Sequence, residues 1–124
     1  MSQVVVALDT ARVRDWATMH DAFADAFGFP AGYARDGDAW IECMAHLDAP
    51  EAGLTRVHAP PGGVVVLRLG VVDDFVARCP DQFAAILDWA ATVNHDRLES
   101  GRPAVLAVSF LAERARFTVS RWSA

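Results

Sequence analysis

Long apolar runs and positive charge are both scarce in this sequence. No segment approaches the ~20 consecutive apolar residues that span a bilayer, and the start of the chain, MSQVVVALDT, lacks the positive region of a secretory signal. There are 11 basic residues against 16 acidic ones, which gives a net charge of −5. An acidic chain is a poor direct partner for nucleic acid and a good one for a basic protein. We therefore expect a cytoplasmic protein that contacts no membrane and binds a basic protein.

Motifs for catalysis, metals and cofactors are also scarce. The two cysteines, Cys43 and Cys79, make no metal-binding spacing with each other or with the four histidines, and we expect both to be reduced. Gly62 and Gly63 precede a strand, whereas a phosphate loop needs glycines between a strand and a helix. No serine stands in the glycine-flanked elbow of a hydrolase. The sequence predicts a protein that uses no cofactor or metal and is not an enzyme.

The expected elements alternate between strands and helices. The 124 residues, 53% apolar and 22% charged, are typical of one globular domain. Apolar runs predict strands at 3–8, 64–69 and 104–110, and helical spacing predicts helices at 15–27, from 36 to 47, from 73 to 79 and from 81 to 94. Strands separated by helices indicate an α/β fold with a small parallel three-stranded sheet. The first strand is apolar at successive positions, so we expect it inside the sheet, buried on both faces.

The C-terminal residues and one loop extend this plan. Residues 116–122 alternate between polar and apolar side chains, which predicts an antiparallel edge strand in a hairpin with 104–110. We therefore take 1–124 as one domain, with a core at 3–110 and an extension at 111–124. The prolines and glycines of 48–63 predict a long loop after the helix that starts at 36.

The helix from 36 to 47 is apolar on one side and acidic on the other. Asp36 is a natural N-cap, and Trp40 begins an apolar stripe. Asp38 and Glu42 lie four residues apart and share a face, although like charges at this spacing cost a few tenths of a kcal/mol, roughly. One interpretation is an ordinary solvated face behind a capping residue. The other is that a partner outside the helix requires these carboxylates.

The residues around this helix resemble the barstar family of ribonuclease inhibitors. The similar pattern is a hydrophobic residue, proline, tyrosine, and an acidic helix start: Phe29, Pro30, Tyr33, Asp36, Asp38, Ala39 and Glu42. The resemblance implies a parallel three-stranded sheet with helices packed on it. It also implies an intracellular, stoichiometric inhibitor of immunity or antitoxin type, which blocks a basic ribonuclease or related nuclease toxin with its acidic helix.

The resemblance assigns partner-binding roles to five residues. Asp38 and Glu42 match the two central acids of the family and would imitate an RNA phosphate. Asp36 stands at the family's asparagine, where it would cap the helix and add charge. Tyr33 and Ile41 would supply apolar contact.

Other positions depart from the family pattern. Gly32 replaces one of two adjacent tyrosines, Ile41 replaces a tryptophan, and Ala91 stands where a later helix carries an acid. Arg35 adds a positive charge that a basic enzyme would repel. These departures predict a changed partner and leave two further hypotheses open. One is an interaction module of the same fold with a partner that is not a ribonuclease, bound through the C-terminal hairpin, and the other is a small hydrolase or metal-binding enzyme.

Overall fold

The chain forms one parallel sheet covered by helices. The computed structural model describes residues 2–113, and in that range the strands β1 (Gln3–Ala7), β2 (Val64–Val71) and β3 (Leu106–Leu111) pair in the order β1-β2-β3. The helices are η1 (Thr10–Arg12), α1 (Trp16–Phe27), α2 (Gly37–Ala45), η2 (Pro50–Ala52), α3 (Asp73–Arg78) and α4 (Pro80–Glu99). This confirms the α/β fold and its parallel three-stranded sheet. The expected edge strand at 116–122 lies outside the described residues.

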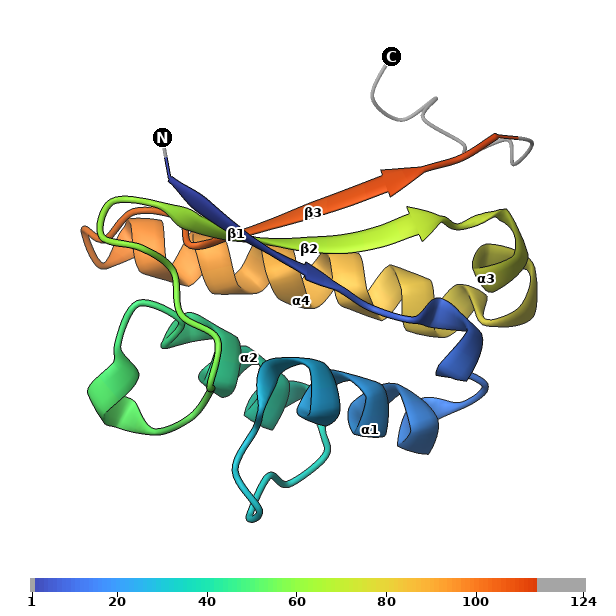
Figure 1. Cartoon of the computed structure of the whole chain (residues 1–124), viewed down its shortest axis with the longest axis horizontal. Coiled ribbons are helices and arrows are strands. Elements are labelled where there is room, and N and C mark those ends of the chain that lie inside the picture. The colour runs from blue at the N-terminus through green and yellow to red at the C-terminus, as the bar shows by residue number, and fades with distance from the viewer. Residues whose placement is uncertain (1, 114–124) are drawn as a thin grey trace.

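Helices cover one face of the sheet (Figure 1). Leu67 and Leu69 of β2 point to that face and are buried, whereas Val5 of β1 is on the other face and is 47% exposed. Within the described residues β1 is also at one edge of the sheet. The prediction that 3–8 is buried on both faces inside the sheet is therefore wrong. An apolar run at the edge of an open sheet looks the same in sequence as one in its centre.

Helix α4 continues past its predicted end at residue 94. Asn94 connects it to β3, because its side-chain amide donates to the carbonyl of Leu106 at 2.6 Å and its oxygen accepts from the N–H of Val105 at 3.1 Å. The helix then runs on to Glu99 and buries Arg97. Asn94 and Arg97 are polar and would be expected at the surface from their sequence, but here they form hydrogen bonds inside the protein.

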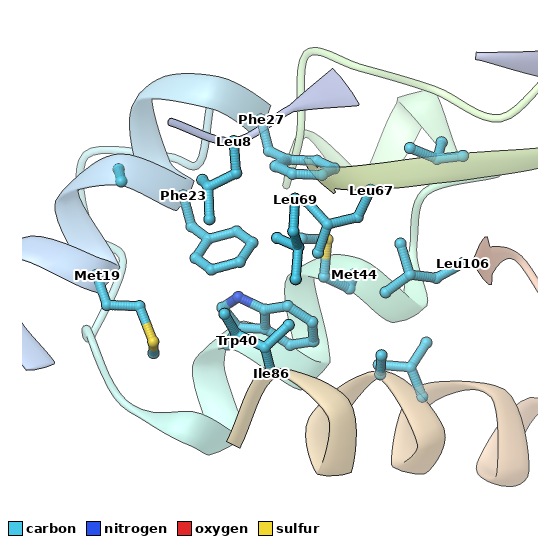
Figure 2. Packing of buried hydrophobic residues seen from close by; sticks show 14 of the residues in the cluster. Leu8, Met19, Phe23, Phe27, Trp40, Met44, Leu67, Leu69, Ile86 and Leu106 are labelled. Carbon is cyan, nitrogen blue, oxygen red and sulfur yellow. The ribbon is translucent and has the colours of Figure 1, made fainter. Parts of the chain in front are cut away.

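The core lies between the sheet and the helices α1, α2 and α4. Figure 2 shows Trp40 in this core between Phe23 and Ile86. The rings of Phe23 and Trp40 meet edge to face, with centroids 5.3 Å apart and planes at 84°. The Nε1 atom of Trp40 has no hydrogen-bond partner among residues 2–113, and in Figure 2 it points toward the ring of Phe23. The ring contact between Phe23 and Trp40 thus holds α2 against α1.

Candidate functional site

Helix α2 begins at the cap that the sequence predicts. The Oδ1 atom of Asp36 accepts a hydrogen bond from the N–H of Ala39 at 2.8 Å, and the backbone of Asp36 is extended. Such a cap stabilises a helix by ~1 kcal/mol, and its negative charge lies at the positive end of the helix dipole. One carboxylate oxygen of Asp36, Oδ1, is therefore already engaged in a hydrogen bond within the protein.

Asp38 and Glu42 carry the exposed charge of α2. Both side chains are exposed, and within residues 2–113 neither carboxylate accepts a hydrogen bond or forms an ion pair. Ile41 lies between them in sequence and is half-buried against the core. The opposite face of α2 buries Trp40, Cys43 and Met44. The helix thus presents two free carboxylates from a fixed base.

The thiol of Cys43 is buried on α2 next to the exposed Glu42. Burial raises the pKa of this thiol to about 11, and the neighbouring charge of Glu42 contributes in the same direction. The thiol therefore stays protonated, and it is not a nucleophile at neutral pH.

The loop before α2 carries a positive charge that is already paired. Arg35 has a left-handed backbone, with φ of 60°, which is uncommon for a residue other than glycine. Its guanidinium forms an ion pair with Asp21 of α1 and donates to the carbonyl of Ala17 at 3.2 Å. These contacts hold the unusual backbone and offset the charge. The repulsion expected from Arg35 toward a basic partner is accordingly reduced.

Tyr33 is turned inward. Its hydroxyl shares a hydrogen bond of 2.6 Å with Nδ1 of His20. The centroid of its ring lies 4.7 Å from the ring centroid of Phe29. Burial raises the pKa of Tyr33 and lowers that of His20. Both groups are therefore neutral at pH 7 and share one hydrogen bond. Tyr33 supports the loop before α2 with its hydroxyl and has only part of its ring left for a partner.

Trp89 of α4 supports the start of α2 and was missed in the sequence. A Cβ atom added to Gly37 would lie 2.9 Å from Cε2 and Cζ2 of the Trp89 indole. The same indole lies 5.7 Å from the ring of Trp40 and stacks at 5.9 Å on His20. The glycine that follows Asp36 is the only signal in the sequence for this close approach, and it does not identify its partner.

A buried arginine fixes the other end of α2. Arg97 is 1% exposed, and its guanidinium donates to the carbonyls of Ala45 at 2.8 Å and of Pro103 at 2.8 Å. It also forms two hydrogen bonds to the carboxylate of Asp48, at 2.7 and 3.0 Å. The Arg97 bonds lower the pKa of Asp48. This bidentate pair holds the C-terminal end of α2 on α4.

The loop 48–63 leaves the acidic face uncovered. It bonds to the C-terminal ends of α1 and α2, through the N–H of Arg56 to the carbonyl of Phe27 and the N–H of Ala59 to the carbonyl of Leu47, each at 2.8 Å. Asp38 and Glu42 remain exposed beside it. The loop therefore packs away from the N-terminal half of α2.

Other kinds of site find no support in the described range. A surface pocket of about 390 Å³ lies beside the start of α1, and none of the five predicted site residues lines it. Among residues 2–113, no group of three His, Cys, Asp or Glu side chains is placed to hold a metal ion. In the same range no helix has the length and apolar character needed to cross a membrane.

Comparison with known proteins agrees with the arrangement of strands and helices. A family model described as Barstar (barnase inhibitor) matches residues 3–109. The match spans all of β1 and β2, the acidic helix α2, and most of β3. A search of curated proteins finds no match to the chain. The resemblance seen around α2 thus extends over most of the sequence, and the chain belongs to the barstar family.

Proposed function

We propose that the chain is a cytoplasmic, stoichiometric inhibitor of a basic ribonuclease, of immunity or antitoxin type, and performs no catalysis itself. The observation that carries this proposal is the pair of exposed carboxylates, Asp38 and Glu42, which have no partner within residues 2–113 and stand on a helix held at both ends. The description of its family as barnase inhibitors supports a ribonuclease as the partner. A helix fixed in this way pays little entropy when it binds.

Each proposed contact has a distinct chemistry. Asp38 and Glu42 imitate the charge of an RNA phosphate and accept hydrogen bonds from arginine or lysine side chains in the nuclease active site. Asp36 adds charge, although its Oδ1 atom caps α2. The half-buried Tyr33 and Ile41 contribute apolar contact at the margin. The nuclease is blocked because the acidic helix occupies the position of its substrate.

A second candidate is an interaction module of the same fold whose partner is not a ribonuclease. It is favoured by Gly32, in the loop before α2, and by Ile41 on α2, because neither position offers an exposed aromatic side chain. Its proposed contact surface, the C-terminal hairpin, includes residues outside the described range. Binding that survives Glu42→Ala and is lost on deletion of 113–124 would support this candidate.

The test is a titration of barnase, acting on RNA, with the wild-type chain and with Glu42→Ala. Glu113→Ala is the matched control, because Glu113 is also an exposed glutamate and follows β3, whose C-terminal end lies away from α2 in Figure 1. Inhibition by the wild type is expected to saturate at equal amounts. Glu42→Ala is expected to weaken this inhibition at least tenfold, which corresponds to about 1.4 kcal/mol. This magnitude is taken from charge pairs of the barnase–barstar complex.

Salt provides a second readout in the same experiment. Association steered by charge slows as ionic strength rises, so added salt should slow inhibition by the wild type more than inhibition by Glu42→Ala. Full inhibition by Glu42→Ala at both salt concentrations would remove the proposed mechanism. No inhibition by the wild type at any ratio would contradict a barnase-type nuclease as the partner.

A further inference from the structure

An exposed aromatic platform lies beside the acidic start of α2. Trp16, the first residue of α1, is 44% exposed. Its ring lies 6.0 Å from that of Trp89, with the two planes at 30°. Trp89 in turn packs against Gly37, between the capping residue and Asp38. The exposed indole is therefore one ring away from the backbone that carries the site carboxylates.

The platform is rigid. Trp89 is held from three sides, by the start of α2, by the stacked ring of His20 at 5.9 Å and by the ring of Trp40 at 5.7 Å. Trp16 rests on this fixed indole. An aromatic surface that is already ordered binds a partner with little loss of side-chain entropy. Tryptophan is also among the residues that most often dominate the binding energy of an interface.

The charges around the platform are mainly negative. Asp15 immediately precedes Trp16 and is exposed, and hydrogen bonds from Thr18 lower its pKa. Asp36 and Asp38 flank the glycine on which Trp89 packs. Asp15 and Asp36 also accept hydrogen bonds within the protein, and Asp38 has no partner within residues 2–113. A π face beside negative charge attracts a cation, because the ring quadrupole and the carboxylates act in the same direction.

The nearby arginines do not occupy the platform. Arg35 is paired with Asp21, which lies roughly 140° around α1 from Trp16 at 3.6 residues per turn. Arg14 lines the separate surface pocket that also contains Asp21. Arg35 also acts on His20, and Arg14 acts on Asp15, so both arginines lie near the platform. Within residues 2–113, however, neither guanidinium stacks on the ring of Trp16 or Trp89.

We propose that Trp16, supported by Trp89, is the aromatic anchor of the docking surface and receives one arginine or lysine side chain of a basic partner protein. The cationic group stacks on the exposed indole while carboxylates at the start of α2 bind its N–H groups. This inference rests on the proposed function, since it takes the partner to be basic, and it extends the docking surface from α2 to α1 and α4. Among the described residues, it supplies the exposed aromatic contact that Tyr33, Gly32 and Ile41 do not offer.

The test measures the dissociation constant for barnase with three substitutions of Trp16. Trp16→Phe keeps a π face, whereas Trp16→Leu keeps apolar area without one, and Trp16→Ala keeps neither. Leu98→Ala is the matched control, because Leu98 is an apolar side chain of α4 that is 60% exposed and lies past the region of Trp89. We expect binding about tenfold weaker for Trp16→Ala and Trp16→Leu, within about threefold for Trp16→Phe, and unchanged for Leu98→Ala.

The outcomes separate this inference from the proposed function. If Asp38→Ala weakens binding and Trp16→Ala does not, the inference is overturned and the function of α2 stands. Equal binding by Trp16→Leu and the wild type would show an apolar contact and would also overturn it. If Trp16→Ala instead abolishes self-association of the chain and leaves barnase binding unchanged, the occupant is a second copy and the inference is wrong.

A second probe decides the case in which barnase does not bind at all. A short peptide amide rich in arginine is titrated into the chain, and the indole N–H signal of Trp16 is followed by NMR and assigned by its loss in Trp16→Phe. A saturable shift of this signal, weakened in Asp36→Ala and Asp38→Ala, would support the cation site although the ribonuclease proposal has failed. A signal that does not move would overturn the inference as well.

Discussion

The indole of Trp89 packs so closely against Gly37 that an added Cβ atom would lie 2.9 Å from two of its ring carbons. Gly37→Ala is therefore expected to push α2 away from α4. Overpacking of this kind costs ~1–3 kcal/mol, which exceeds the helix propensity that alanine gains over glycine. The measurement is the free energy of unfolding from urea denaturation.

Gly32→Ala is the matched control for this prediction. A Cβ atom at Gly32 has no neighbour within 4 Å, and its backbone is not left-handed, since Gly32 is absent from the positive-φ glycines of the described chain. Its stability should stay within about 0.5 kcal/mol of the wild type. Equal stability of both variants would show that α2 moves freely on Trp89.

Replacement of Arg97 should release the C-terminal end of α2. Arg97→Met replaces the guanidinium by a long apolar side chain and leaves the carbonyls of Ala45 and Pro103 without their donor. An unsatisfied buried acceptor costs ~1–3 kcal/mol, so we expect a loss of about 3 kcal/mol in urea denaturation. Arg102→Met, which removes an exposed arginine from the same region, should cost less than about 0.5 kcal/mol. Similar losses in both variants would contradict the structural role of Arg97.

The sequence predicted the elements of the site better than their support. Asp36 was identified as a cap because capping is local and depends on a residue type at a helix start. The exposure of Asp38 and Glu42 followed from their spacing. The burial of Arg97 could not be predicted in this way, because its partners Asp48 and Pro103 are distant along the chain or lie in a loop.

The outward position of Trp16 shows a second limit of sequence patterns. Trp16 falls on the apolar stripe of α1, yet it is the first residue of the helix and is 44% exposed, with its ring packed against that of Trp89. The open face of β1 has a similar cause, because Val5 points away from all the helices. Periodicity indicates which residues share a face and does not indicate what covers that face.

The stability of the fold should fall in mild acid because of His20. Burial lowers the pKa of His20, Arg35 lowers it further, and Asp36 and Asp21 oppose the shift. The unfolded chain, with an ordinary histidine pKa of 6.5, then binds more protons than the folded chain. The contribution of neutral His20 to stability is therefore fully present above about pH 6.5 and is lost as the pH falls through and below this value.

Urea denaturation at several values between about pH 8 and pH 5 measures this effect. His20→Gln, which has no ionisable ring, should lose less stability over the range than the wild type. His95→Gln serves as the control, since His95 is exposed on α4. An identical pH dependence for the wild type and His20→Gln would rule out His20 as the cause.

The two cysteine thiols should be inert in the native state. Cys43 is 4% exposed and Cys79 is 2% exposed, and burial raises the pKa of Cys43 to about 11, with Glu42 acting in the same direction. At mildly alkaline pH a thiol reagent should react with both only as fast as the protein unfolds, and rapidly in urea. In the Glu42→Gln variant the Cys43 thiol should stay unreactive as well, because burial is the larger cause of its raised pKa. Fast reaction of native Cys43 would contradict its placement.

Carboxyl footprinting in the presence of barnase tests the central claim most directly. A carbodiimide couples an amine to exposed carboxylates, and mass spectrometry gives the extent of labelling at Asp38, Glu42 and the distant control Glu113. The account predicts that labelling of Asp38 and Glu42 falls as barnase is added and levels off at equal amounts, while labelling of Glu113 stays constant. Unchanged labelling of Asp38 and Glu42 with barnase in excess would contradict it.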